Sequence, residues 1–149
     1  MASGQHSHQL SISDRPPGRA KVLIVDDDPT HLEIYGMLLQ QAGYEPVAAL
    51  VKFAGVEIPR DKSIRLVLLD YTLHSLRTST EFAQEIRRVL PDAPIVVLSD
   101  LWCLPADIAP FVNEFVRKGQ PAKLLEMVGR LLPLVTEPAA AQMDGEAKD

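Results

Sequence analysis

The chain has 149 residues, 46% of them hydrophobic, and a net charge of −5 at pH 7. This composition suits one folded domain with its own core, and the negative charge argues against direct nucleic-acid binding, which uses clustered Lys and Arg. The single cysteine, Cys103, excludes an intrachain disulfide, and no apolar run approaches the roughly 18 residues of a membrane helix. We therefore expect a cytoplasmic protein without membrane contact.

The two ends of the chain differ in composition from the middle. Residues 1–19 are rich in Ser, Gly, His, Pro and Gln, and residues 134–149 are rich in Ala and end in charges. Neither segment shows an apolar period, so both are predicted to be disordered. His6 and His8 in the first segment are interpreted as solvated side chains. This leaves one folded domain over residues 20–133.

The first half of the domain begins with an apolar strand over residues 22–25 that acidic residues end. A helix is predicted over residues 29–42, with Asp28 as its N-cap and Pro29 at its first position. A second strand follows over residues 46–51. The next connection, residues 52–62, contains a glycine and a proline and leaves room for only a short helix.

The second half repeats the alternation of strand and helix. A strand over residues 64–69 precedes a helix whose start carries Thr78 and Glu81, spaced as a capping box. Further strands are predicted over residues 95–98 and 114–116, and a last helix over residues 121–132. The connection between these two strands is short and holds Pro105 and Pro110, so we expect one short or distorted turn in place of a fourth helix.

Continuous apolar strands separated by helical segments predict a parallel sheet covered on both faces, which is a doubly wound α/β fold. In such folds ligands bind at the carboxyl ends of the strands. The residues that follow the strands here are polar, and they are Asp26, Asp27, Asp70, Ser99 and Lys118. The sequence therefore predicts that three carboxylates, a hydroxyl and an amine meet at one edge of the sheet.

Three carboxylates in one place repel one another, by about 4 kcal/mol per pair at ~4 Å and an effective dielectric near 20. A divalent cation relieves this repulsion, and hard oxygen ligands at an open site favour Mg²⁺, which usually also meets a phosphate. On this interpretation Asp70 is the attacking carboxylate, Lys118 neutralises phosphoryl oxygens and Ser99 hydrogen-bonds one of them. Asp28 is assigned only its structural role as a cap.

Four motifs carry a resemblance to a known family: VLIVDDDP at residues 22–29, LVLLDYTL at 66–73, IVVLS at 95–99 and FVRK at 115–118. Together they resemble the receiver domain of bacterial two-component response regulators, over about residues 20–132. The resemblance implies a flavodoxin-like, CheY-like sheet of five parallel strands in the order 2-1-3-4-5.

The resemblance also implies a function. Asp70 would accept a phosphoryl group from a histidine kinase, a phosphotransfer protein or a small phosphodonor. Mg²⁺ would be held by Asp26, Asp27 and Asp70, directly or through water, with the backbone carbonyl of Thr72 as a further ligand. Ser99 and Phe115 match the family's switch pair, which reshapes the surface of the fourth and fifth units on phosphorylation.

Three positions depart from the family pattern. His74 stands where proline is usual, Gly119 replaces the proline that normally follows the lysine, and Asp100 stands where a small residue is usual. A cis bond before a non-proline residue costs about 2.5–4 kcal/mol, so the bond before Gly119 is predicted to be trans. Asp100 would repel a phosphoryl group if it pointed inward, and outward it would cap the next turn. We expect the outward orientation.

The fourth connection also contains Leu101, Trp102 and Leu104, which need cover. Two interpretations of Trp102 remain open at this stage: it forms an apolar patch for a partner or a second copy of the chain, or it folds back onto its own core. Cys103 is interpreted as a buried filler rather than a reactive thiol.

Three functions compete. The first is a stand-alone phosphoreceiver that signals through protein contact to an unidentified target and is no enzyme beyond its own phosphorylation and dephosphorylation. The second is a receiver-like interaction module that takes no phosphate, which the departures at His74, Asp100 and Gly119 favour. The third, a Mg²⁺-dependent phosphatase with an aspartyl-phosphate intermediate, ranks last because Thr72 occupies the position of its second carboxylate.

Overall fold

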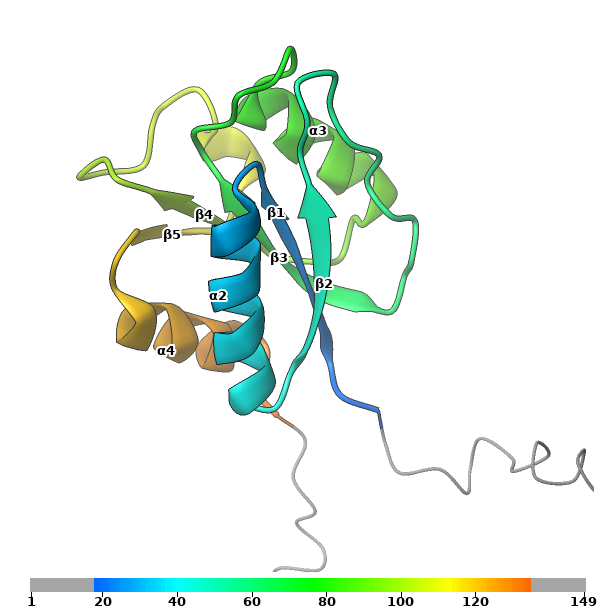
Figure 1. Ribbon diagram of the computed structural model, residues 1–149, viewed down its shortest axis with the longest axis vertical. Helices are drawn as coiled ribbons and strands as arrows, with labels where there is room; N and C mark the ends of the chain where they lie inside the picture. Colours follow the sequence, from blue (N-terminus) through cyan, green and yellow to red (C-terminus); the bar gives the residue numbers. More distant parts are fainter. Residues whose placement is uncertain (1–17, 135–149) are drawn as a thin grey trace, which may run out of the picture.

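The computed structural model describes residues 18–134, so the predicted tails lie outside the described residues except for 18, 19 and 134. All five strands are parallel and form one sheet in the order β2-β1-β3-β4-β5 (Figure 1). The strands are β1 Lys21–Asp26, β2 Glu45–Leu50, β3 Ile64–Asp70, β4 Ile95–Ser99 and β5 Glu114–Arg117. The predicted doubly wound α/β fold and its strand order are confirmed.

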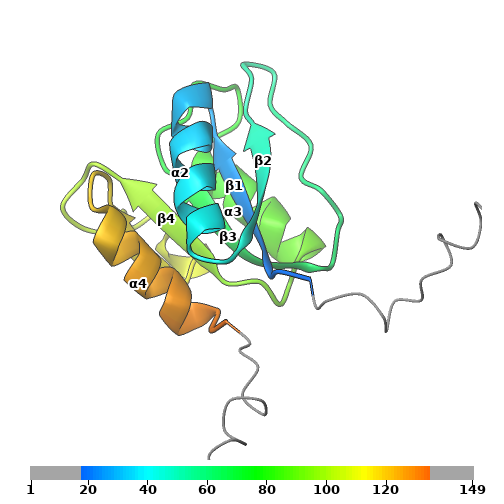
Figure 2. The same cartoon turned by 60° about the horizontal axis from the view of Figure 1, so that its bottom comes forward.

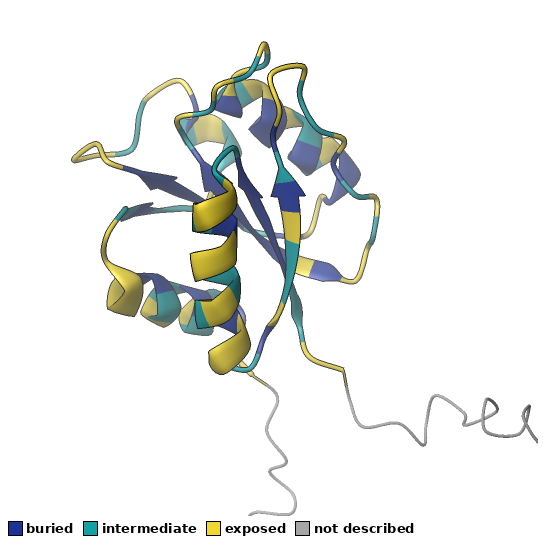
Figure 3. Cartoon of the chain, in the orientation of Figure 1, coloured by how far each residue is buried: buried dark blue, intermediate teal, exposed yellow. Residues whose placement is uncertain are grey.

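Helices cover both faces of the sheet. Helices α2 (Pro29–Gln41) and α4 (Pro121–Leu131) lie on one face, and α3 (Ser79–Val89) lies on the other (Figures 1 and 2). Because side chains alternate along a strand, Val22 and Ile24 pack toward α2 and α4 while Leu23 and Val25 pack toward α3. The central strands are consequently buried on both sides, as the dark ribbons of Figure 3 show.

Side-chain caps begin two of the helices as the sequence predicts. Asp28 Oδ1 accepts the Thr30 N–H at 2.9 Å, with Pro29 at the first helical position of α2. Thr78 Oγ1 accepts the Glu81 N–H at 3.1 Å while the Glu81 carboxylate accepts the Thr78 N–H at 3.0 Å. None of the helices in residues 18–134 has both the length and the apolar character that crossing a membrane requires.

Two connections lack the helix that this alternation of elements would normally place there. Residues 52–62 form no helix, so the predicted short helix is wrong; a tight turn closed by a Lys52–Gly55 bridge is found instead. Fully buried Ile58 anchors this segment, and the following Pro59 has no N–H for a helix. The fourth connection contains only the 3₁₀ helix η2, Ala109–Phe111, which confirms the predicted short or distorted turn.

Arg87, in the last turn of α3, holds the fourth connection in place. Its Nε donates to the Phe111 carbonyl at 3.0 Å and its Nη1 to the Ala93 carbonyl at 2.9 Å, and Nη2 bonds the Asn113 side chain. Hydrogen bonds from a charged donor contribute more than neutral ones. One guanidinium therefore replaces part of the backbone bonding that a helix would have provided.

Asp107 ties the same connection to the loop after β3. Its two carboxylate oxygens accept hydrogen bonds from the Tyr71 and Thr80 hydroxyls, each at 2.9 Å. Ile108 beside it is fully buried in the core next to α3. The connection is thus fixed at its centre by one polar and one apolar anchor.

The beginning of the fourth connection is exposed. Trp102 is 81% exposed, and the Arg117 guanidinium lies 3.7 Å from the centre of its ring, so the interpretation in which Trp102 folds onto the core is wrong. Cys103 is also exposed, which contradicts its assignment as a buried filler. Leu104 alone packs against the core, because the chain turns inward only from that residue.

The contacts of Arg87 predict a specific loss of stability. Arg87→Ala removes the donor from the part-buried carbonyls of Ala93 and Phe111 and from the Asn113 side chain. The free energy of unfolding should therefore fall by about 2–3 kcal/mol. The neighbouring exposed Arg88 is the matched control, and Arg88→Ala should change the free energy of unfolding by no more than about 0.5 kcal/mol. Urea denaturation followed by circular dichroism measures both, and equal effects would contradict this role of Arg87.

Candidate functional site

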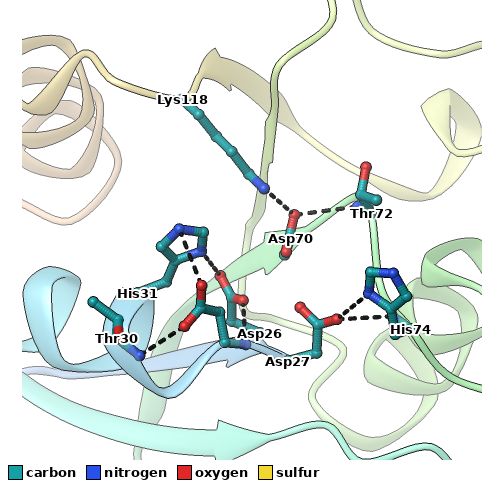
Figure 4. Close-up of polar contacts among 9 residues, drawn as sticks. Asp26, Asp27, Thr30, His31, Asp70, Thr72, His74 and Lys118 are labelled. Atoms are coloured by element: carbon teal, nitrogen blue, oxygen red, sulfur yellow. Dashed lines mark hydrogen bonds and ion pairs between the residues drawn. The ribbon is translucent and has the colours of Figure 1, made fainter.

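An open hollow lies at the carboxyl ends of β1 and β3, where the sequence predicts the site. Its volume is about 420 Å³. Figure 4 shows carboxylates of the first and third strands beneath the lysine that follows β5. The residues around the hollow are Asp27, Asp28, Pro29, His31, Asp70, Thr72, His74, Asp100 and Lys118.

Asp70 and Lys118 form the central contact. Asp70 is the last residue of β3 and is only 2% exposed, and its Oδ1 accepts the Thr72 N–H at 3.1 Å and lies 2.8 Å from Lys118 Nζ. Burial alone lowers the pKa of Lys118, but its hydrogen bond and charge interaction with Asp70 outweigh this and raise the pKa above its usual value. The lysine is therefore a permanent cation in the hollow, and the predicted meeting of these two residues is present.

Asp26 is the most deeply buried acid of the site, at 1% exposure. Its Oδ1 accepts the Asp28 N–H at 2.9 Å, whereas its Oδ2 is buried without a hydrogen-bond partner among the described residues. Burial, together with the charge of Asp70, raises the pKa of Asp26 to about 6 although the Asp28 N–H opposes the shift. An ionised Asp26 thus lacks part of the compensation that a buried charge needs.

Asp27 is bound by His74 from the loop after β3. The backbone N–H and the ring Nδ1 of His74 both lie 2.9 Å from Asp27 Oδ2. Burial alone raises the pKa of Asp27, but these contacts lower it below its usual value. The substitution of the family's usual proline therefore places an imidazole, itself 89% exposed, on one of the predicted metal ligands.

The donor set of the hollow fits a hard divalent cation. The carboxylates of Asp27 and Asp70 line the hollow together with Thr72, and Asp26 offers an oxygen within 4.8 Å of one from Asp70. The buried Oδ2 of Asp26 is the strongest observation for a bound cation, because it accepts no hydrogen bond among the described residues and its contact with His31 Nδ1 is 3.4 Å long. Among the described residues that line the hollow, Lys118 is the one lysine or arginine, so the carboxylates there outnumber the permanent cations.

His31 is a site residue that the sequence interpretation missed. One atom each of Asp26, His31 and Asp70 lie within 4.8 Å of one another. His31 stands in the first turn of α2, where side chains lean back toward the helix start and so toward the strand end. Its spacing of three residues from the Asp28 cap was the available signal, but a lone histidine on a helix is usually only solvated.

The predicted switch residues lie beside the hollow rather than in it. Ser99 ends β4 and is fully buried, and its Oγ accepts the Leu101 N–H at 3.0 Å. Phe115, on β5, is half-buried against the core next to α3 and also borders a second hollow together with Trp102. These two residues connect the site with the exposed start of the fourth connection.

Asp100 and Gly119 are the two other positions that depart from the family pattern, and the structure shows the surroundings of both. Asp100 is exposed and lines the rim of the hollow, and it makes no side-chain hydrogen bond within the part of the chain described. The predicted capping of the next turn is performed by Ser99 instead. The described residues contain no cis peptide bond, so the bond before Gly119 is trans as predicted, and Gly119 adopts a positive φ of 81°.

Comparisons with known proteins give one consistent family. The family model described as "Response regulator receiver domain" matches residues 22–126. The transcriptional regulatory protein GlrR of Escherichia coli (strain K12) is 31% identical over 90 residues, which is 60% of this chain and 20% of GlrR. The chain therefore spans about a fifth of the length of the curated relatives it matches.

Solved structures share the fold. The chemotaxis protein CheY4 of Vibrio cholerae has a TM-score of 0.62 and 22% identity, covering 77% of this chain and 100% of CheY4. The response regulator protein TrrA of Thermotoga maritima, solved in complex with Mg²⁺-BeF, has a TM-score of 0.61 and 28% identity, covering 75% of this chain and 98% of TrrA. The predicted CheY-like architecture is confirmed by these similarities.

The buried charge of Asp26 predicts a pH-dependent stability in metal-free protein. Because the folded-state pKa is raised from 3.8 to about 6, the native state binds a proton more tightly than the unfolded state, and stability falls as pH rises through this window. Asp26→Asn should therefore raise the free energy of unfolding by about 1–3 kcal/mol near pH 7, and by less near pH 5.

Urea denaturation in EDTA at both pH values measures this effect. Asp92→Asn, at an exposed acid, is the matched control and should leave the stability within about 0.5 kcal/mol at both pH values. A variant at Asp26 that is less stable than the unsubstituted protein near pH 7 would show that the carboxylate is compensated in the folded state.

Proposed function

This chain belongs to the response regulator receiver domain family, and on that premise we propose that Asp70 is its phosphoacceptor. The observation that carries the proposal is the 2.8 Å contact between Asp70 Oδ1 and Lys118 Nζ in a hollow lined by further carboxylates. An ammonium group so placed neutralises the oxygens of a phosphoryl group once that group is bound to Asp70.

The proposed step is a phosphoryl transfer to Asp70 Oδ2, which accepts no hydrogen bond among the described residues while Oδ1 carries both contacts. A bond forms from this oxygen to phosphorus, and the bond from phosphorus to a histidine nitrogen or to an acyl-phosphate oxygen breaks. The electron pair leaves with the imidazole or carboxylate. Water later attacks the aspartyl phosphate, so the protein catalyses at most its own phosphorylation and dephosphorylation.

The proposed ligands of Mg²⁺ are Asp26, Asp27 and Asp70, directly or through water, and the backbone carbonyl of Thr72. When bound, the cation offsets negative charge on the carboxylates and on the transferring group. The unpartnered oxygen of Asp26 supports this set, and so does the Mg²⁺-BeF complex of the relative TrrA. The hydrogen bond from the Thr72 N–H to Oδ1 orients the Asp70 carboxylate.

Ser99 and Phe115 are the proposed switch pair. The Ser99 oxygen already accepts the Leu101 N–H, and its own O–H proton remains available to a phosphoryl oxygen. Drawing this hydroxyl toward Asp70 would release the Leu101 N–H and so free the start of the fourth connection. Phe115 borders the second hollow beside Trp102, so movement of this segment changes the surface there.

The proposed partners are a histidine kinase or phosphotransfer protein as phosphodonor and a downstream protein that contacts the surface around Trp102, a second copy of this chain being one candidate. We place the receiver at residues 20–133. Action as a stand-alone receiver stays a prediction, because the curated relatives are about five times as long as the matched segment.

A second candidate function is an interaction module of the same fold that is not phosphorylated. The observation in its favour is the pair of contacts from His74 to Asp27 Oδ2, which occupy an oxygen that a cation would need. Asp100 at the rim adds a negative charge that opposes an incoming phosphate. The two functions differ in one measurable event, covalent modification of Asp70.

Incubation of the full chain with Mg²⁺ and acetyl phosphate should add the mass of one phosphoryl group in intact-protein mass spectrometry. Asp70→Asn should abolish the addition, and Lys118→Ala should slow it by about 100-fold or more, because a single charge-stabilising donor is removed. EDTA should prevent it. Asp92→Asn, at an exposed acid, is the matched control and should be modified at the original rate.

Absence of both Mg²⁺ binding in calorimetry and any mass addition would favour the interaction module. Modification that persists in Asp70→Asn would place the acceptor elsewhere and contradict the assignment.

A further inference from the structure

The imidazole of His31 lies between two carboxylates at the start of α2. Its Nδ1 is 3.4 Å from Asp26 Oδ2, and its Nε2 is 3.6 Å from Asp28 Oδ2 (Figure 4). Both His31 Nδ1 and Asp26 Oδ2 are buried atoms without a hydrogen-bond partner among the described residues. A cation placed between these two buried atoms would give each of them the partner that it lacks, provided that Nδ1 carries the lone pair of the neutral imidazole.

The same two residues belong to a group with a third donor residue. An oxygen of Asp70 completes the set, with all three ligand atoms within 4.8 Å of one another. Donors around one cation lie at about 2.0–2.2 Å from it, so a small inward movement is enough to coordinate a single ion. Asp26 is only 1% exposed, so its Oδ2 is a buried atom and does not belong to an ordinary exposed carboxylate.

The second nitrogen of His31 has a carboxylate beside it, Asp28 Oδ2 at 3.6 Å, which is slightly beyond hydrogen-bond distance. A coordinating imidazole usually donates its other ring N–H to a carboxylate, which fixes the tautomer and the ring orientation. Asp28 Oδ2 lies on the Nε2 side of the ring, and this leaves Nδ1 as the lone pair that faces Asp26. Asp28 thus has two roles, because its Oδ1 caps α2 while its Oδ2 faces the His31 ring.

We propose that His31 supplies a nitrogen ligand to the divalent cation of this hollow, so that the protein favours first-row transition ions over Mg²⁺. Imidazole suits later first-row ions such as Co²⁺, Ni²⁺ and Zn²⁺, whereas Mg²⁺ prefers oxygen ligands and binds nitrogen poorly. The inference rests on the proposed metal-dependent function of Asp70 and adds the identity of the metal class. Asp28 acts as the positioning residue for the ring.

Calorimetric titrations with Co²⁺ and with Mg²⁺ test the selectivity. The full chain carries two more imidazoles at His6 and His8, so every variant is made in the His6→Ala/His8→Ala background. His31→Asn exchanges the nitrogen donor for an amide and should weaken Co²⁺ binding by about 10-fold or more while Mg²⁺ affinity changes by less than about threefold. Equal changes for the two ions would overturn the proposal.

A spectroscopic measurement on the protein that retains His31 detects the nitrogen ligand directly. This measurement does not depend on whether the His31 variant folds. Pulsed electron paramagnetic resonance of the Mn²⁺ complex should show coupling to an imidazole nitrogen, which His31→Asn removes. His74→Asn, at the other imidazole beside the hollow, is the matched control and should retain the coupling. Asp28→Asn keeps the helix cap and should weaken Co²⁺ binding by about 10-fold, because the ring loses its charged partner.

The outcomes separate this inference from the function on which it rests. Modification of Asp70 with Mg²⁺, together with a Mn²⁺ spectrum that lacks nitrogen coupling, means that His31 is only an ion-pair partner of Asp26 and Asp28. Nitrogen coupling without modification of Asp70 under either ion means that the chain is a metal-binding module of this fold. The second result supports the ligand assignment and overturns the proposed phosphoacceptor.

Discussion

The close approach of buried acids at the ends of β1 and β3 is the constraint on which the rest of this structure depends. Asp26 and Asp70 are both almost fully buried and offer oxygen atoms within 4.8 Å of each other, and among the described residues Lys118 is the lysine that lines the hollow beside Asp70. Parallel pairing of β1 with β3 fixes this placement, since both residues end strands that the core surrounds. The fold therefore carries a cost of repulsion between buried carboxylates, which a bound divalent cation would relieve.

Most of the fold could be predicted because its signals are local. Each strand is an apolar run, and the caps at Asp28 and Thr78 mark helix starts through side chains within three residues. The acids were predictable for the same reason, because position after a strand implies position at the sheet edge. Asp70 and Lys118 meet as expected although 48 residues of chain separate them.

What could not be predicted depends on the path of loops and on single side chains. Exposure of Trp102 and Cys103 follows from a connection that turns inward only at Leu104, and no sequence period encodes that path. His31 carries no pattern of its own and gains meaning only from the carboxylates on either side of its ring. Ser99 was expected in the hollow, but its Oγ accepts a hydrogen bond from the Leu101 N–H instead.

The most direct test of the central claim is a crystal structure of the full chain with Mg²⁺ and beryllofluoride, a stable mimic of the bound phosphoryl group. We expect a beryllofluoride bonded to the carboxylate of Asp70, with Lys118 Nζ and Ser99 Oγ within hydrogen-bond distance of its fluorides and a cation in contact with Asp26 Oδ2. A structure in which Asp70 keeps its ion pair with Lys118 and carries no adduct at saturating concentrations would contradict it.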